Sequence, residues 1–243
     1  FMQVTSPPYR IRFEDMELPP DVREAWHRMG LPRLRSTSTR RVSRAYSLAN
    51  HPGEAGIVML VVRLAIPPPG TPPETPPGVV SSWLFSLKPG DTADIAGPHG
   101  HFFAEESERE MVFIGGGAGM APMRSHILAQ LEHLEARCPI TFWYGARSAR
   151  DLFYEETFDR LQREHENFRW TVALSEPRPE DQWAGATGFI HQVVHDRYLA
   201  THPAPESCDY YLCGPPVMIR AVVAMLDDLG VDPERIRYDD FGG

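Results

Sequence analysis

Two patterns of hydrophobic and polar residues divide the chain. Up to about residue 108, short strand-like runs alternate with proline and glycine; they are FMQV (1–4), RAYSLA (44–49), GIVMLVVRLAI (56–66) and DTADIAG (91–97). Short strands separated by turns are typical of a small antiparallel barrel. The polar stretch ESERE (106–110) follows. We therefore predict an N-terminal antiparallel Greek-key barrel domain over residues 1–108 and a second domain over 109–243.

Two insertions interrupt the first half. PDVREAWHRMG (20–30) reads as an amphipathic helix that begins at proline and ends at Gly30. PPPGTPPETPPG (67–78) contains seven prolines and is expected to form an extended loop. The chain begins at Phe1, already in a strand-like run, so the barrel is expected to lack its first strands.

The second half alternates strand and helix patterns, which predicts a doubly wound parallel sheet with both faces covered by helices. Five strands are expected, in the order 3-2-1-4-5. The expected strands are MVFIG (111–115), ITFWYG (140–145), WTVAL (170–174), DYYLCG (209–214) and RIRYDD (235–240). The expected helices are 122–137, 155–166, 187–202 and 215–230.

Composition excludes several classes of function. A formal net charge of −9 argues against nucleic acid as a partner. The arginine run between Arg33 and Arg44 is read as a solvated face, with an anion site as the alternative. The longest apolar run is too short to span a membrane and contains Arg63. The spacing of the three cysteines fits neither a disulfide framework nor a metal site, and no metal is predicted.

Glycine-rich loops follow the first and fourth predicted strands. They are GGGAGMAP (115–122) and CGPP (213–216), and each precedes a helix. The strand order 3-2-1-4-5 makes these loops neighbours at the point where the order reverses, which is where such sheets bind ligands. Their backbone N–H groups and helix N-termini would suit a pyrophosphate. Gly115 and Gly117 match two glycines of G-x-G-x-x-G, whereas Met120 occupies the third glycine's place.

The end of the second strand bears on the choice of nucleotide. YGAR (144–147) lacks the acidic residue that binds the ribose of NAD. By that rule Arg147 favours a 2′-phosphate, and hence NADP. The alternatives are an arginine that stacks on adenine or one that lies in solvent.

A second group of candidates lies in the first half. Strand alternation places Arg44 and Tyr46 on one face and Ser47 on the other. An arginine can bind a phosphate, a tyrosine can pack on a planar ring, and a hydroxyl can reach a ring nitrogen. The segment Gly78–Ser82 opens an expected helix and is a second candidate for binding phosphate.

Together these motifs resemble the ferredoxin–NADP reductase superfamily. R-x-Y-S, a G-x-x-S helix start, a glycine-rich loop with A-P, C-G-P and an acidic residue near a terminal aromatic occur in that order. The longer matches resemble the flavin-binding subunits of sodium-translocating NADH:quinone reductases. They are FIGGGAGMAPMRSH (113–126), FWYGARS (142–148), GFIH (188–191), YYLCGPP (210–216) and DDFGG (239–243).

The resemblance implies a barrel that binds FAD and a nucleotide domain that binds NADH. It assigns hydride transfer to Ser47, Cys213, Asp239 and Phe241. The residues that it assigns to cofactor binding are Arg44, Tyr46, Ser47, Val62, Arg63, Gly78, Val80, Ser81, Ser82, Gly115, Gly117, Ala118, Gly119, Pro122, Gly145, Arg147, Cys213, Gly214 and Pro215. Phe241 would lie on the exposed flavin face until nicotinamide displaces it, or would pack at a sheet edge.

The implied reaction transfers a hydride from NADH to FAD, after which electrons pass to a 2Fe-2S centre and finally to quinone. The resemblance to the family implies NADH as the nucleotide, whereas Arg147 favours NADPH. Of the two we expect NADH. Expected partners are a preceding 2Fe-2S domain of the same protein and the other components of a membrane complex. The fragment itself is expected to be soluble, held at the cytoplasmic face of a bacterial inner membrane by a preceding region. The alternatives are the reductase component of an aromatic-ring oxygenase and a nucleotide-binding module without flavin.

Overall fold

The structure, a computed structural model, describes residues 1–68, 70–72 and 74–240, and it forms two compact units. The first unit comprises Phe1–Ser47 and Val61–Gly100, and the second comprises Leu48–Leu60 and His101–Gly243. The segment 48–60 therefore belongs with the second unit although its sequence lies inside the first half. The assignment of functional domains to 1–108 and 109–243 stays a prediction.

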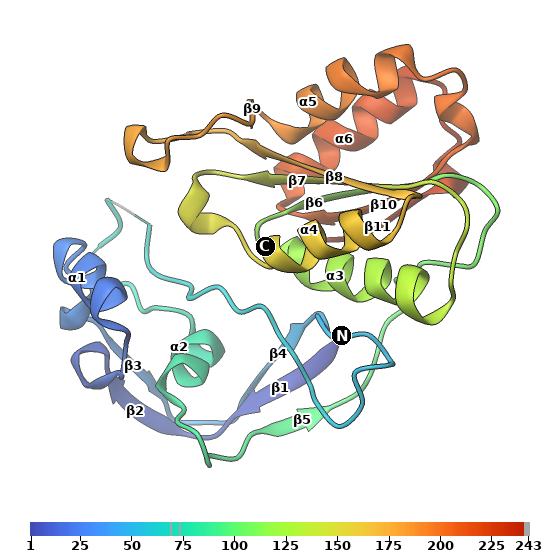
Figure 1. The fold of residues 1–243 in the computed structure, drawn as a ribbon. Coiled ribbons are helices and arrows are strands. Elements are labelled where there is room, and N and C mark those ends of the chain that lie inside the picture. The colour runs from blue at the N-terminus through green and yellow to red at the C-terminus, as the bar shows by residue number, and fades with distance from the viewer. Residues whose placement is uncertain (69, 73, 241–243) are drawn as a thin grey trace. The chain divides into compact units, whose positions relative to one another are not determined.

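The first unit contains two small antiparallel sheets (Figure 1). One has the strand order β4-β1-β5, and the other pairs β2 with β3. The strands are β1 (Met2–Ser6), β2 (Tyr9–Arg12), β3 (Arg35–Ser38), β4 (Val42–Tyr46) and β5 (Asp94–Ala96). The expected antiparallel part of the fold is confirmed, whereas β2 and β3, with the sequences YRIR and RSTS, were not predicted.

Strand β1 shows why this half folds as it does. Its burial alternates, with Met2, Val4 and Ser6 buried. Helix α2 (Val79–Ser86) packs against β1 and β4 and supplies Val80 and Trp83 to this small core. The predicted helix start at Gly78 is confirmed.

The inserted helix α1 (Pro20–Arg28) forms where it was predicted. Proline stands at its first turn, and Gly30 just beyond its end has φ 68°, a left-handed conformation that glycine adopts without strain. Trp26 packs on Phe13 with a centroid distance of 5.6 Å. Met16 and Leu31 complete this separate cluster of buried residues.

The strand expected over residues 56–66 does not form. Only a single bridge joins Leu60 to Leu48, and residues 61–66 have no strand partner among the described residues. The apolar run predicted a strand, but a strand also needs a neighbouring edge with which to form hydrogen bonds. Leu64 and Ile66 instead pack against the cluster around Phe13.

The second unit contains one parallel sheet in the order β11-β10-β6-β7-β8-β9. The five predicted strands form in the predicted order, and the short β9 adds a sixth at the edge. The strands are β6 (Met111–Gly116), β7 (Ile140–Ala146), β8 (Phe168–Leu174), β9 (Ala186–Thr187), β10 (Asp209–Gly214) and β11 (Ile236–Asp240).

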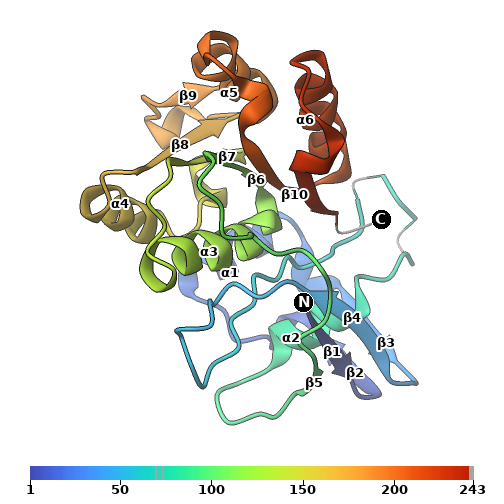
Figure 2. The same ribbon diagram turned by 90° about the vertical axis from the view of Figure 1, so that its right-hand side faces the viewer.

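Helices cover both faces of this sheet, as Figures 1 and 2 show. On one face α3 and α4 pack over a cluster that includes Met123, Phe142 and Phe158. On the other, α5 and α6 enclose a cluster that includes Val194 and Val222. The helices are α3 (Met120–Leu128), α4 (Glu155–Glu164), α5 (Ile190–Arg197) and α6 (Pro216–Asp228). Helix α3 continues into a π-helical turn over Ala129–His133.

The three cysteines all belong to the second unit, and each is buried. Burial raises the pKa of Cys208 to about 12 and also raises the pKa of Cys138. Among the described residues, no helix combines the length and apolar character that a membrane span requires.

Candidate functional site

The predicted nucleotide loops leave adjacent strands of the second unit. Strands β6 and β10 pair in parallel, with Gly115 opposite Cys213, and β11 places Asp239 opposite Cys213 on the other side. Three predicted positions from distant parts of the sequence therefore lie side by side. They stand at the carboxyl ends of the strands, where the strand order reverses, as predicted.

The two loops approach so closely that Gly119 must lack a side chain. A Cβ atom built there would lie 2.0 Å from the carbonyl oxygen of Cys213 and 2.8 Å from the nitrogen of Gly214. Gly117 has φ +54°, and a Cβ built on it would meet nothing within 4 Å. The backbone at Gly117 is thus open on the side from which a pyrophosphate could approach, just before the N-terminus of α3.

Other predicted positions serve packing inside the second unit. A Cβ on Gly145 would lie 3.0 Å from Ile190, and one on Gly115 would lie 3.0 Å from Met123. Pro122 and Cys213 are buried, Cys213 completely. These residues shape the edge of the sheet, whereas Gly117 and Ala118 are accessible.

Arg147, just after the end of β7, forms an ion pair. Its Nη2 donates to Glu176 Oε2 at 2.8 Å, and both side chains are mostly exposed. Glu176 lies two residues beyond the end of β8. Sequence reasoning missed this residue, although an acidic residue after the next parallel strand was a usable signal because neighbouring carboxyl ends meet at one edge. A carboxylate here neutralises the arginine on which the NADP prediction depended.

The first unit gathers the other predicted residues on one sheet. In the register of β1 and β4, Arg44 lies opposite Val4 and Tyr46 lies opposite Met2, so all four share a face. Helix α2 packs against both strands, and Val4 is buried. Arg44 is exposed, and its guanidinium donates to the carbonyl of Ser43. Burial raises the pKa of Tyr46.

The start of α2 offers polar groups of the kind that bind phosphate. Gly78 has a backbone hydrogen bond to Ala65, and a Cβ there would lie 2.7 Å from the Ala65 side chain. Ser81 Oγ bridges Gly78 and Ala65. Ser82 Oγ is buried without a hydrogen-bond partner among the described residues. A helix N-terminus with an unsatisfied hydroxyl, on the sheet face that holds Arg44 and Tyr46, fits the phosphate end of FAD.

Five predicted residues remain. Ser47 is buried, and Asp239 is partly buried near the carboxyl end of β11. Val62 and Arg63 lie in the segment that does not form a strand. Phe241, predicted to cover the flavin, lies outside the described residues.

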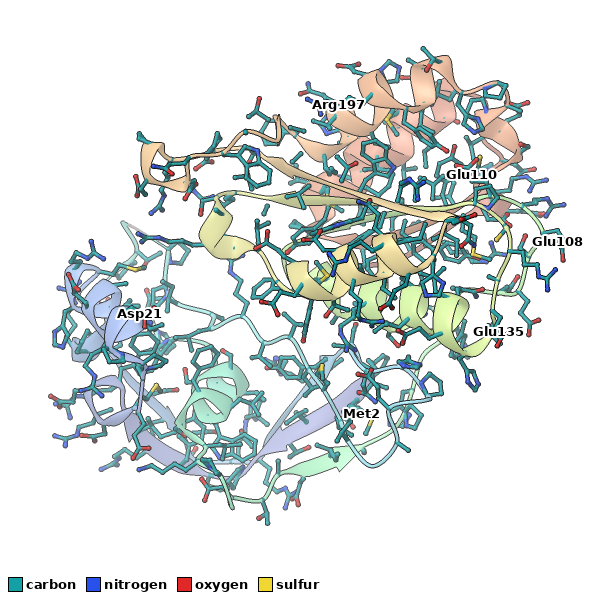
Figure 3. The ribbon with its side chains drawn as sticks, in the orientation of Figure 1. Met2, Asp21, Glu108, Glu110, Glu135 and Arg197 are labelled. Carbon is teal, nitrogen blue, oxygen red and sulfur yellow. The ribbon has the colours of Figure 1, made fainter. Side chains whose placement is uncertain are left out.

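A separate cluster of polar groups lies near the opposite ends of β6 and β10. The ligand atoms of Glu110, His202 and Cys208 lie within 4.8 Å of one another, and Figure 3 labels Glu110. The N–H of Ala204 donates to His202 Nδ1, so Nε2 carries the proton and donates to Glu110 at 3.0 Å. Tyr198 also donates to Glu110. With Nε2 protonated, this cluster is a hydrogen-bond network and does not present a free ligand to a metal.

Two family descriptions match the two halves of the chain. Residues 29–103 match the oxidoreductase FAD-binding domain, and residues 113–224 match the oxidoreductase NAD-binding domain. The fit of the residues described above to FAD and to a dinucleotide agrees with both.

The curated relatives extend the likeness to the whole chain. The F subunit of the Na(+)-translocating NADH-quinone reductase in Yersinia pseudotuberculosis is 56% identical over 243 residues, which is all of this chain and 60% of the relative. The corresponding protein of Serratia proteamaculans is also 56% identical over the same 243 residues. The chain thus spans about three fifths of the length of these relatives.

Solved structures show the same fold. The flavohem-like FAD/NAD-binding domain of nitric oxide dioxygenase from Vibrio cholerae has a TM-score of 0.69 at 25% identity, over all of this chain and 84% of that one. The chain is a FAD- and NAD-binding oxidoreductase region of the ferredoxin reductase superfamily, related over its whole length to the F subunit of the Na(+)-translocating NADH-quinone reductase.

Proposed function

We propose that the chain transfers a hydride from NADH to FAD, with FAD bound by the first unit and NADH by the second. The observation that carries the proposal is the register that places Gly115, Cys213 and Asp239 side by side beneath two converging loops. FAD supplies the acceptor chemistry when bound. The residues of the chain supply binding, orientation and exclusion of water.

Binding of NADH is assigned to the loops at the ends of β6 and β10. Gly117 and Ala118 are partly accessible, so their backbone N–H groups, just before α3, would donate to the pyrophosphate. Gly119, Gly214 and Pro215 keep the second loop against the first. Cys213 and Asp239, on adjacent strands, would define the place of the nicotinamide ring.

Binding of FAD is assigned to β4 and the start of α2. Arg44, the N–H groups of Val80 and Ser81 and the Ser82 hydroxyl would hold the pyrophosphate, and Tyr46 would pack against the ring system. The Ser47 hydroxyl would donate to the flavin nitrogen that receives the hydride. Its burial would keep water from that hydrogen bond.

We infer a preference for NADH over NADPH. The Arg147 guanidinium that could bind a 2′-phosphate is already paired with Glu176. A 2′-phosphate would have to displace that carboxylate and would experience its negative charge. The ribose hydroxyls of NADH carry no such charge.

The destination of the electrons also belongs to the proposal. By likeness to the quinone reductase relatives, the chain would act in a multi-subunit quinone reductase, with a 2Fe-2S centre as the first acceptor and quinone as the last. The same proposal includes docking on other components of that complex, association with the membrane and a contribution to sodium transport.

A second candidate is the reductase component of an oxygenase. The ferredoxin reductase of carbazole 1,9a-dioxygenase has a TM-score of 0.68 at 27% identity, over 99% of this chain and 59% of that one. The identity to the quinone reductase relatives is twice as high, which favours quinone reduction. A nucleotide-binding module without flavin is disfavoured by the match to the FAD-binding domain.

One experiment tests the proposal. We expect the purified chain to bind FAD one to one and to lose the visible flavin absorption when NADH is added without oxygen. Arg44→Ala should weaken FAD binding about tenfold or more, because a charge-assisted contact to phosphate is lost. Arg10→Ala, an exposed arginine on β2, is the matched control. A chain that binds FAD but is not bleached by NADH contradicts the proposal.

A further inference from the structure

Arg124 forms a buried ion pair that the proposed function does not yet use. It lies on α3, one helical turn after the nucleotide loop, and its side chain is 9% exposed. Its two terminal nitrogens donate to both carboxylate oxygens of Glu54 at 2.7 and 2.8 Å. Such a two-point pair fixes direction as well as distance.

The same guanidinium also holds the backbone of the segment 48–60. Arg124 Nη1 donates to the carbonyl of Ala49 at 2.7 Å. The next residue on α3, Ser125, donates its hydroxyl to the carbonyl of Asn50 at 2.9 Å. The Tyr154 ring centroid lies 5.0 Å from the Arg124 guanidinium, a cation–π distance that adds a further contact to the arginine.

The segment 48–60 is itself closed into a compact loop. Leu48 bridges to Leu60, and the N–H of Ala49 donates to the carbonyl of Met59 at 2.8 Å. The side chain of Asn50 bonds the backbone at both Ile57 and Met59. The loop therefore moves as one piece, and α3 fixes that piece.

Electrostatics make this attachment persistent. The Arg124 guanidinium lowers the pKa of Glu54 to about 2, so the carboxylate stays charged across the physiological range. The backbone N–H of His51 also donates to Glu54, at 3.0 Å. Because Arg124 is buried, loss of its partner would leave an uncompensated charge.

The anchored segment 48–60 can influence Ser47 because the two are adjacent in the chain. The segment follows Ser47 directly and continues into Val61 to Arg63. Ala49, held by Arg124, is two residues from Ser47. Two residues of backbone leave little freedom, so an anchored Ala49 restricts where the Ser47 hydroxyl can lie.

We propose that Arg124 is a positioning residue for hydride transfer: with Glu54 it anchors the segment 48–60 and thereby sets the position of Ser47. The inference rests on the proposed function. It assigns to Arg124 no contact with substrate or cofactor, and its effect is transmitted through Glu54 and Ala49. Hydride transfer is sensitive to displacements of this kind, since a shift of 1 Å can lower a rate about 100-fold.

The test compares Arg124→Lys, Glu54→Gln and the double variant with the unaltered chain. Single-turnover reduction by NADH measures the hydride-transfer rate, and titration measures NADH affinity. Amide hydrogen exchange of residues 47–60, recorded without any nucleotide, gives a readout independent of activity. Arg235→Met is the matched control, because Arg235 pairs with Asp209 in the same unit and does not touch the segment.

We expect each single variant to bind FAD, to lower the hydride-transfer rate about 10- to 100-fold and to change NADH affinity less than threefold. Exchange in 47–60 should rise, and the double variant should lose little more than either single one. An unchanged rate with faster exchange would overturn the inference, because the pair would then serve stability alone. So would unchanged exchange. Failure of the unaltered chain to be reduced by NADH would instead contradict the proposed function.

Discussion

The two units are stabilised in different ways. The second is built on one parallel sheet with a large cluster of buried side chains on each face. The first has two small antiparallel sheets and a separate cluster around Phe13 and Trp26. Charge differs as well: basic residues slightly outnumber acidic ones in the first unit, so the net charge of −9 arises in the second. Buried apolar side chains form the strands of the second unit, whereas many strand residues of the first unit are polar and at least partly exposed.

Core truncation should give the largest contrast between the units. Phe158 is fully buried among Phe142, Phe168 and Trp170, so Phe158→Ala should lower the free energy of unfolding by about 3–5 kcal/mol. Phe13→Ala should cost less, because Phe13, although buried, belongs to a small cluster with Met16, Trp26 and Leu31 that borders a surface hollow of about 340 Å³. Urea denaturation measures both losses, and hydrogen exchange shows which unit opens. Equal losses of unfolding free energy in the two variants would contradict the expected difference between the two units.

Gly119 gives the next largest effect. A Cβ there would collide with the Cys213 carbonyl, so Gly119→Ala should weaken NADH binding about 10- to 100-fold, the equivalent of 1–3 kcal/mol of overpacking. Gly230→Ala, after α6, is the control: its side chain has space, and only the left-handed backbone is strained, at about 1 kcal/mol. Fluorescence titration with NADH measures both. If Gly230→Ala weakened NADH binding more than Gly119→Ala, the close contact between the two loops would be unimportant for binding.

A buried histidine should make the stability of the second unit depend on pH. Burial lowers the pKa of His126 from its ordinary 6.5 to about 4, which favours the neutral ring. The unfolded chain therefore takes up a proton first, and stability present above pH 6.5 is lost as pH falls towards 4. The expected loss is about 3 kcal/mol.

Denaturation between pH 7 and pH 4 measures this slope. His126→Leu should flatten it, because the buried ring no longer titrates. His133→Leu, at an exposed position, should leave it unchanged. An identical slope in all three proteins would assign the pH dependence to other groups.

The smallest expected effect concerns nucleotide choice. Glu176→Gln removes the charge that faces Arg147, so kcat/KM for NADPH relative to NADH should rise about three- to tenfold, in line with the modest energy of exposed pairs. Glu180→Gln, next to Arg178 on the same connection, is the control. A ratio that stays constant would show that Arg147 does not approach the 2′ position.

The sequence predicts the second unit well, because each buried strand there is a continuous apolar run such as MVFIG or DYYLCG. The run GIVMLVVRLAI was equally apolar and forms no strand, since pairing depends on a distant edge that a local pattern does not encode. Strand β3, with the sequence RSTS, was missed because it is polar, yet it forms a strand because β2 pairs with it.

Within the candidate site, the closeness of the glycine loops at the ends of β6 and β10 followed from the predicted strand order, whereas the register of Gly115, Cys213 and Asp239 comes from the structure. Glu176 and the pair of Glu54 with Arg124 were not predicted, because they join residues 29 and 70 positions apart through side chains. No spacing rule connects such residues. The pair of Glu54 with Arg124 depends on the segment 48–60 lying against α3, which only the structure shows. The pair of Glu176 with Arg147 could have been predicted from the neighbouring strand ends.

The placement of the thiols has a practical consequence. All three cysteines are buried in the second unit, and the first contains none. An alkylating reagent added to the native chain can therefore react only when the second unit opens. The rate of cysteine modification therefore reports the opening of the second unit alone and is insensitive to fluctuations of the first unit.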